Sequence, residues 1–277
     1  MESVSKIEFA KRRDFGEVLN VTFQFLRQNF KSLGLALLYI AGPFILIQGI
    51  ITGYYQIDTF NFQNTGFLDA YTFLYFLTTL SQMITYAVII SVVYEYIVLY
   101  LNNENETITV NMVWEQSQKS IIPTIVMMIG IGLLIGLGFI LLIIPGIYFM
   151  VVISLFWIVI FKEGVSFSTA VSRCITLIKN NWWKTLGLII IGFILQYAVS
   201  FIFALPTVII VILKMLSGFE NAVVSNVPDI LTIIFAIIAA FAELFYAISL
   251  VILAFQYFNL VEGKDAEGLL TKIDNIS

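Results

Sequence analysis

The sequence has no histidine and only one cysteine, Cys174, in 277 residues. The missing histidine excludes Ser–His–Asp triads, zinc sites of the His-Glu-x-x-His kind and histidine proton relays. A single cysteine excludes an internal disulfide framework and a cysteine-rich metal site. The sequence also lacks a phosphate-binding loop that ends in Gly-Lys-Ser or Gly-Lys-Thr. We therefore expect a protein that is not an enzyme and that carries no cofactor and no metal.

Charged residues are scarce as well, and this scarcity indicates the class of protein. They make up 12% of the chain, hydrophobic residues make up 60%, and the mean hydropathy is +0.98. A soluble domain is about a quarter charged and about half apolar. The lipid bilayer is therefore the expected surrounding of this chain. Its further expected partners are other membrane proteins or a second copy of itself, and nucleic acid is not expected.

The apolar residues fall into six long runs, and the basic residues lie on one side of them. If each run crosses the bilayer once, thirteen of the fourteen Lys and Arg residues share a face, and Lys214 is the exception. An excess of Lys and Arg in short loops marks the cytoplasmic side. We predict an all-α, multi-pass membrane protein with six transmembrane helices, both termini in the cytoplasm and no cleaved signal peptide. The runs are Leu33–Thr52, Tyr71–Leu101, Pro123–Ile144, Ile147–Phe161, Thr185–Leu213 and Ile230–Leu260.

An amphipathic helix is predicted before the first, third and fifth runs. The segments 15–33, 107–122 and 166–183 have apolar residues at helical spacing, which favours a position in the membrane interface. We interpret the chain as three units, each an interfacial helix followed by a helical hairpin, with Pro145–Gly146 as the turn of the second hairpin. A basic and aromatic belt at the start of any membrane hairpin explains part of this similarity. The predicted segments are 1–32 (cytoplasmic N-terminus with its interfacial helix), 33–101 (first hairpin), 102–163 (second unit), 164–260 (third unit) and 261–277 (cytoplasmic tail).

Glu243 is the acid that lies deepest in an apolar run. It follows Ile230, the first residue of the sixth run, by thirteen positions, and Ala236 and Ala247 share its helical face. Small residues on that face predict that the carboxyl group points toward other helices rather than toward lipid. Because a carboxylate at the midplane is costly unless it is protonated or paired, Gln196 and Gln48 are its expected hydrogen-bond partners. A functional group and a protonated structural link are both open interpretations.

Five residues near the start of the fifth run are candidates for contact with lipid. Trp182 and Trp183 are followed by Lys184, a combination typical of an anchor at the membrane interface. Arg173 and Lys179 precede them in the sequence. The group is therefore predicted to anchor the chain, and a lipid-headgroup site is the alternative.

Gly132 and Gly136 are four residues apart in the third apolar run. A Gly-x-x-x-Gly pair lets two helix backbones approach closely in a membrane. We therefore predict that both glycines serve helix packing.

Part of the chain resembles a known family. It carries LLIIPGIYFM at 141–150, KEG at 162–164, AVSR at 170–173 and NWWK at 181–184. This combination resembles a bacterial inner-membrane superfamily typified by the membrane domain attached to some glycerophosphodiester phosphodiesterases. The resemblance is strongest over 138–192 and implies a six-helix membrane module in the bacterial cytoplasmic membrane. It does not imply phosphodiesterase activity, because that chemistry belongs to a separate, histidine-containing domain of those fusions.

Three functions are open on these observations. The first is a non-catalytic module that serves as a scaffold or accessory subunit of a membrane complex, or that organises lipid. The second is a transporter or lipid-handling protein that uses Glu243 at the membrane midplane. The third is an intramembrane enzyme, which needs converging polar groups that the sequence does not provide. The first is the function that we expect.

Overall fold

The computed structural model describes residues 6–60, 69–103, 107–141, 143–217 and 228–274. Some side chains within these ranges lie outside the description, among them that of Lys214, the predicted outer cation. Every element in the described ranges is a helix. The elements are α1 (Phe15–Gln28), α2 (Phe30–Phe60), α3 (Asp69–Asn102), α4 (Val110–Leu141), α5 (Ile143–Ile153), α6 (Phe156–Glu163), α7 (Phe167–Ile178), α8 (Trp182–Ser217), α9 (Asp229–Ala240), the 3₁₀ segment η1 (Phe241–Phe245) and α10 (Tyr246–Asp274).

Six helical segments of the described chain are long and apolar enough to cross a membrane. The predicted all-helical architecture and the predicted number of potential spans are therefore confirmed. The segments are Phe30–Thr59, Phe73–Asn102, Val110–Ile140, Ile143–Glu163, Trp182–Ile210 and Asp229–Lys264.

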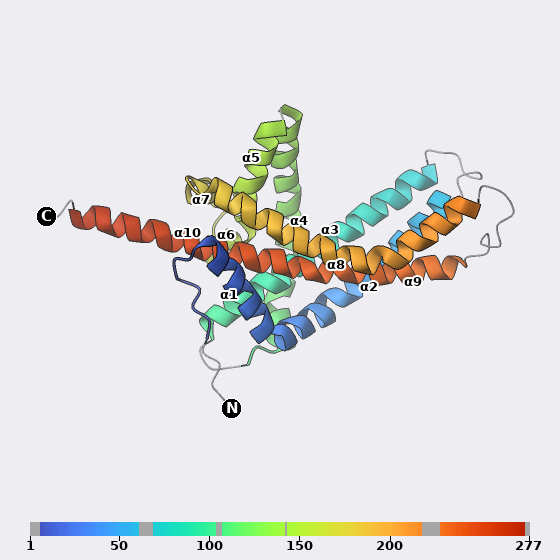
Figure 1. Ribbon diagram of the computed structural model, residues 1–277, viewed down its shortest axis with the longest axis horizontal. Coiled ribbons are helices and arrows are strands. Elements are labelled where there is room, and N and C mark those ends of the chain that lie inside the picture. The colour runs from blue at the N-terminus through green and yellow to red at the C-terminus, as the bar shows by residue number, and fades with distance from the viewer. Residues whose placement is uncertain (1–5, 61–68, 104–106, 142, 218–227, 275–277) are drawn as a thin grey trace.

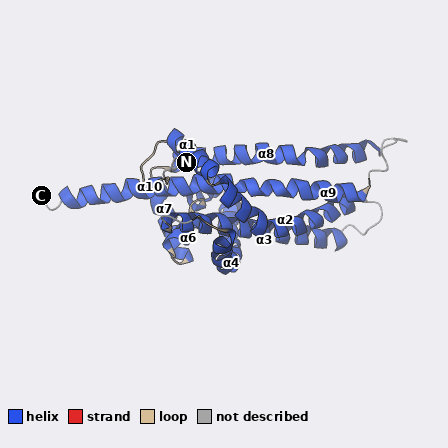
Figure 2. Ribbon diagram, turned by 90° about the horizontal axis from the view of Figure 1, so that it is seen from below, coloured by secondary structure: helices blue, strands red, loops and turns tan. Residues whose placement is uncertain are grey.

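Four of the helices, α2, α3, α8 and α9, extend toward the same end of the molecule (Figures 1 and 2). α2 packs against α3 and α9, and α9 also packs against α8. The contact between α2 and α9 is very close at Gly49 and Gly53. A Cβ atom added to these glycines would lie 2.6 Å from Cα of Ile237 and 2.7 Å from Cα of Ile233, respectively. The missing side chains thus allow the two backbones to approach.

The α4–α5 hairpin points in another direction. It rises steeply from the other helices in Figure 1, and α4 is seen nearly end-on in Figure 2. Gly138 and Gly146 bring its two helices together, because a Cβ atom on Gly138 would lie 3.3 Å from Cα of Gly146. On the outer part of α4 the apolar side chains of Leu133, Leu137 and Ile140 are exposed. The α4–α5 hairpin therefore exposes apolar side chains on α4, whereas α2 and α9 are packed closely against each other.

The N-terminal segment is buried among the ends of the spans. Phe9 stacks on Phe255 of α10, with ring centroids 4.3 Å apart. The backbone N–H of Arg13 donates a 2.7 Å hydrogen bond to Asn259, and the Lys184 ammonium donates one of 2.8 Å to the backbone oxygen of Arg13. We call this region, where the N-terminal segment, α1 and α7 meet the adjoining ends of α3, α8 and α10, the basic end. The sequence analysis did not predict that residues before α1 belong to the core.

The predicted amphipathic helix before the first span is α1. Asp14 caps its N-terminus in a capping box with Glu17, which satisfies free backbone N–H groups of the first turn. Asn29 separates α1 from α2, and its side-chain oxygen accepts a 2.9 Å hydrogen bond from Tyr96 of α3. The apolar face of α1 is packed within the protein, mainly on α10. Its buried residues are Val18, Val21, Thr22 and Phe25.

Two details of the predicted three-unit organisation are wrong. The middle unit has no separate interfacial helix, because α4 continues from Val110 into the third span without a break. Pro145–Gly146 do not form the turn of the second hairpin, because both lie in the first turn of α5. Proline is compatible with that position, since the backbone N–H groups of a first helical turn have no intrahelical acceptor. Gly146 instead makes room for the ring of Phe139, which lies 2.6 Å from the place of a Cβ atom.

The fourth and sixth spans are interrupted helices, which the hydropathy pattern did not predict. The fourth span breaks between α5 and α6, where the backbone N–H and the hydroxyl of Ser154 both donate to the oxygen of Val151, at 3.3 and 2.7 Å. Serine competes in this way with the regular hydrogen bonds of a helix. The sixth span tightens into η1 between α9 and α10. Short 3₁₀ stretches inside long helices often mark hinges or strained positions.

Candidate functional site

Glu243 lies in η1, at the interruption of the sixth span. Its Oε1 atom accepts a 2.6 Å hydrogen bond from Nε2 of Gln48, on α2. The hydrogen bond that was predicted between these two residues is therefore present. Gln48 is only 4% exposed, so the contact lies inside the protein. It joins the first potential span to the last.

Tyrosine and glutamine side chains extend this contact into a polar cluster. Tyr86 of α3 interacts electrostatically with Glu243 and Tyr246. It interacts in the same way with Tyr197 of α8, and the side chain of Gln82 hydrogen-bonds to it. The rings of Tyr86 and Tyr246 meet edge to face, with centroids 5.3 Å apart. Gln48 of α2 and Tyr86 of α3 thus lie near the carboxyl group, and Tyr86 connects it to Tyr246 of α10.

Three oxygen atoms of the predicted site residues are buried without a hydrogen-bond partner among the described residues. They are Oε2 of Glu243, Oε1 of Gln48 and Oε1 of Gln196. Gln196 is buried on α8, which packs against η1, but its predicted hydrogen bond to Glu243 is not among the described contacts. The amide oxygens are acceptors only, so a proton on the carboxyl group or a bound water would supply a missing donor.

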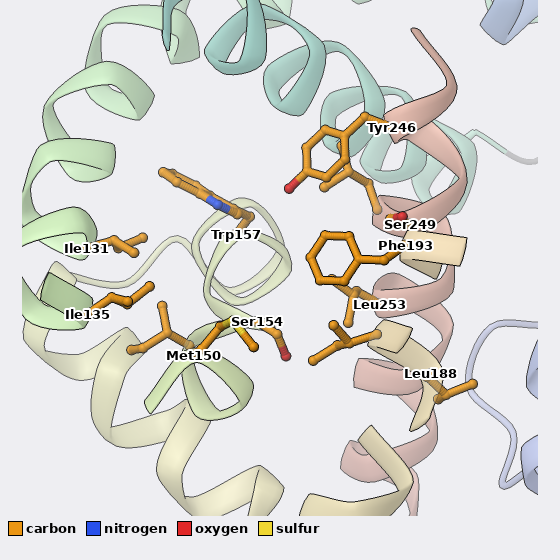
Figure 3. Close-up of a pocket in the computed structure, with 13 residues that line it drawn as sticks. Ile131, Ile135, Met150, Ser154, Trp157, Leu188, Phe193, Tyr246, Ser249 and Leu253 are labelled. Atoms are coloured by element: carbon orange, nitrogen blue, oxygen red, sulfur yellow. The ribbon is translucent and has the colours of Figure 1, made fainter. Parts of the chain in front are cut away.

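A cavity of about 170 Å³ opens between the α4–α5 hairpin and the paired helices α8 and α10 (Figure 3). Ile131 of α4 lies on one side and Phe193 of α8 on the other, while the hydroxyl of Tyr246 points into the space. Ser249 also lines the cavity, and its buried hydroxyl has no partner among the described residues. Because Tyr246 belongs to both, the cavity adjoins the polar cluster of Glu243.

Two of the predicted lipid-headgroup residues, Arg173 and Lys184, have partners inside the protein. Nε of Arg173 is 3.0 Å from Oε1 of Glu163, and this oxygen also accepts a 2.7 Å hydrogen bond from Tyr257. The side chain of Lys184 donates to the backbone oxygen of Arg13. Both cations therefore make contacts within the basic end, and the alternative of a lipid-headgroup site stays a prediction.

The other three predicted anchor residues have different positions. Trp182 stacks on Tyr148 of α5, with ring centroids 6.2 Å apart, and its indole N–H donates to the Tyr148 backbone oxygen at 3.4 Å. Trp183 is 79% exposed, and Lys179 is exposed as well. Trp183 and Lys179 thus have the surface position that an interfacial anchor requires, whereas Trp182 connects α8 to α5.

Gly132 and Gly136 do not pack against another helix of the described chain. No atom lies within 4 Å of the place of a Cβ atom on either residue. Gly130 and Gly138 on the same helix are different, because Cβ atoms there would lie 3.1 Å from the ring of Phe167 and 3.3 Å from α5. Gly132 and Gly136 therefore make no close helix contact within the described chain, and their packing role stays a prediction for contacts with another chain.

Sequence reasoning missed two features that position the site. Gly49 and Gly53, which pack α2 on α9, have the same Gly-x-x-x-Gly spacing, so a signal was present at the end of the first apolar run. No sequence signal indicated the helix break at η1, because residues 229–259 contain neither proline nor glycine. At this break η1 packs against α2 and α8.

The polar cluster can form hydrogen bonds, and its carboxyl group, that of Glu243, can bind and release one proton. Among the described residues, no group of three or more His, Cys, Asp or Glu side chains is placed to hold a metal ion. Comparison with known proteins adds no assignment. No protein-family model matches the chain, and neither a curated protein nor a solved structure is similar enough to count as a match. The resemblance to the bacterial inner-membrane superfamily therefore stays a prediction.

Proposed function

We propose that this protein is a non-catalytic membrane scaffold that docks a helix of another membrane protein, or of a second copy, on α4. The observation that carries the proposal is the contrast among the glycines of that helix. Gly130 and Gly138 are packed inside the chain, whereas Gly132 and Gly136 face open space. An unoccupied face of small residues allows a partner helix to approach closely in a membrane.

The surroundings of this glycine pair support docking. Leu133 and Leu137, next to the glycines, are 64% and 57% exposed, so they can pack around an incoming helix. The α4–α5 hairpin as a whole rises away from the other helices (Figure 1). The hydrogen bond between Gln48 and Glu243 supports a structural role for the acid, because it joins two spans inside the protein.

The same proposal places the protein in the bacterial cytoplasmic membrane, with the basic end and both termini in the cytoplasm. Support comes from the positive-inside rule, since Lys6, Arg13, Lys184 and Lys264 all take part in contacts at one end of the molecule. The sequence resemblance described above points to the same membrane. A scaffold in this orientation would meet soluble partners at the basic end and membrane partners along α4.

Site-specific crosslinking in intact membranes tests the docking proposal. A photoreactive amino acid at Leu133 is expected to give a discrete protein adduct, and its mass distinguishes a second copy from another protein. The same amino acid at Ile209, an exposed residue of α8, is the matched control. Adding Gly132→Leu to the Leu133 probe is expected to reduce the adduct at least tenfold. Equal adducts at both positions, or an adduct that Gly132→Leu leaves unchanged, would contradict docking on α4.

Transport of a small substrate is the second candidate function, and one specific observation favours it. Oε2 of Glu243 is buried in the interrupted sixth span and has no hydrogen-bond partner among the residues that the structure describes. Discontinuous helices surround the binding sites of many transporters. Glu243→Gln keeps a hydrogen-bonding group at this position but removes the exchangeable carboxyl proton. Proton uptake into proteoliposomes that the wild type supports and Glu243→Gln abolishes would establish transport. Equal uptake by both proteins would exclude Glu243 as the coupling group.

A further inference from the structure

A large apolar groove lies between the first half of α2 and the segment that runs from η1 into α10. Its volume is about 700 Å³. None of the predicted site residues lines it. Residues that form its walls include Leu33, Leu37, Leu38, Leu244, Phe245 and Ile248.

Gly34 of α2 lines the groove, and no atom of the described residues lies within 4 Å of the place of a Cβ atom on it. The missing side chain therefore widens the groove along α2. Leu38, one turn further along α2, is 47% exposed. Both walls belong to potential membrane spans, Phe30–Thr59 and Asp229–Lys264. In a bilayer the groove is therefore open to hydrocarbon rather than to water, and an apolar chain fills it best.

One charged residue, Lys31, also lines the groove. It is exposed and is the second residue of α2, so it lies where that span begins, at the level expected for lipid headgroups. A single ammonium beside a long apolar groove is complementary to a molecule that carries a phosphate on a hydrocarbon chain. A soluble anion lacks the apolar part, and a partner protein in this groove is an outcome that the crosslinking experiment below detects.

We propose that the groove binds one phospholipid, with an acyl chain along Gly34 and Leu38 and the headgroup phosphate on Lys31. This inference is independent of docking on α4, because the two surfaces share no residue. Leu244 and Phe245 of η1 form part of the groove wall and follow Glu243 directly. The bound lipid therefore also packs against the interrupted segment that carries the buried carboxyl group.

Native mass spectrometry of the full-length protein in detergent, titrated with phosphatidylglycerol, tests the site. The wild type is expected to bind the first lipid molecule with higher affinity than any further lipid molecules. Gly34→Leu fills the groove and is expected to weaken this first binding event about tenfold. Lys31→Gln removes the cation and is expected to weaken it about fivefold, since a Lys near an anionic headgroup contributes on the order of 1 kcal/mol. Gly263→Leu and Lys162→Gln are matched changes outside the groove, at a glycine with open space around its Cβ position and at an exposed lysine, and they are expected to leave it unchanged.

A second measurement keeps the proposal testable if Gly34→Leu does not fold. A photoreactive amino acid at Leu38 in intact membranes is expected to yield a phospholipid adduct, detected by its mass. A protein adduct at Leu38 would show that a partner helix or a second copy fills the groove, and it would overturn the proposal. First-lipid binding that is the same in wild type, Lys31→Gln and a groove-filling Leu38→Trp variant would overturn it as well.

Discussion

Two glycine pairs with the same spacing have opposite surroundings in this protein. Gly49 and Gly53 of α2 lie against the backbone of α9, and Cβ atoms there would be 2.6 and 2.7 Å from Cα atoms of that helix. Gly132 and Gly136 of α4 have no atom of the described part of the chain within 4 Å of the same positions. The first pair is part of a finished contact within the chain, and the second is free for a contact with something else.

The difference shows what a Gly-x-x-x-Gly spacing specifies. It creates a face that another helix can approach closely, but it does not determine which helix packs there or to which chain that helix belongs. The partner is decided by the direction of the whole hairpin. α2 lies alongside α9, whereas the α4–α5 hairpin rises away from the bundle (Figures 1 and 2). Substitutions at the two pairs therefore test whether one face is occupied and the other free.

The largest expected effect is that of Gly49→Leu. Even the Cβ atom of the new side chain would overlap the backbone of Ile237, so α2 and α9 must move apart. Overpacking a close contact typically costs about 1–3 kcal/mol of the free energy of unfolding, and a backbone neighbour that cannot rotate away puts this change at the upper end. Thermal unfolding in detergent is expected to show a midpoint lowered by roughly 5–10 °C.

Gly132→Leu is the matched control for this substitution. The same side chain is added to a transmembrane glycine, but in open space, so the midpoint is expected to stay within about 1 °C of the wild type. A clear destabilisation by Gly132→Leu in monomeric protein would mean that the face is occupied within the chain. The absence of any effect of Gly49→Leu would mean that α2 and α9 are not in contact.

A smaller effect is expected from the hydrogen bond between Gln48 and Glu243. Gln48→Leu removes the donor and leaves both oxygens of the carboxyl group without a partner among the described residues. Polar contacts between membrane helices contribute about 1–2 kcal/mol, so the midpoint is expected to fall less than with Gly49→Leu. A double-mutant cycle with Gln48→Leu, Glu243→Leu and the double variant measures the interaction energy between the two side chains. Strict additivity of the two single changes would show that the two side chains do not interact in solution.

The sequence predicted those parts of the fold that depend on local composition. The six potential spans follow from runs of apolar residues, and Gln48 was found because few polar side chains lie in those runs. The direction of the α4–α5 hairpin and the break at η1 were not predictable in this way. Both depend on contacts between segments far apart in the chain, such as α2 with η1, and residues 229–259 have no helix-breaking residue. The groove beside Gly34 was missed for the same reason, since its two walls come from opposite ends of the sequence.

The smallest expected effect concerns Cys174 on α7, at the closed basic end. Its side chain is fully buried, and burial, with a smaller contribution from the Glu163 carboxylate, raises the pKa of the Cys174 thiol from 9.0 to about 12. Only the thiolate reacts rapidly with maleimides. At pH 8 the native protein is therefore expected to be labelled at least tenfold more slowly than Ser172→Cys in a Cys174→Ala background, because Ser172 is exposed on the same helix.

The raised pKa also sets the direction of a pH effect. The folded protein holds the thiol proton more tightly than the unfolded chain, so this group contributes stability that is complete below about pH 9 and is lost as the pH rises toward 12. Above about pH 9 the wild type is therefore expected to lose stability relative to Cys174→Ala. Below pH 9 the stability of the two proteins is expected to depend on pH in the same way. Thermal unfolding of both proteins from pH 7 to pH 10.5 measures the difference. Rapid labelling of native Cys174 at pH 8 would show that the basic end opens, and then the contrast between a closed basic end and a free α4 face would not hold in solution.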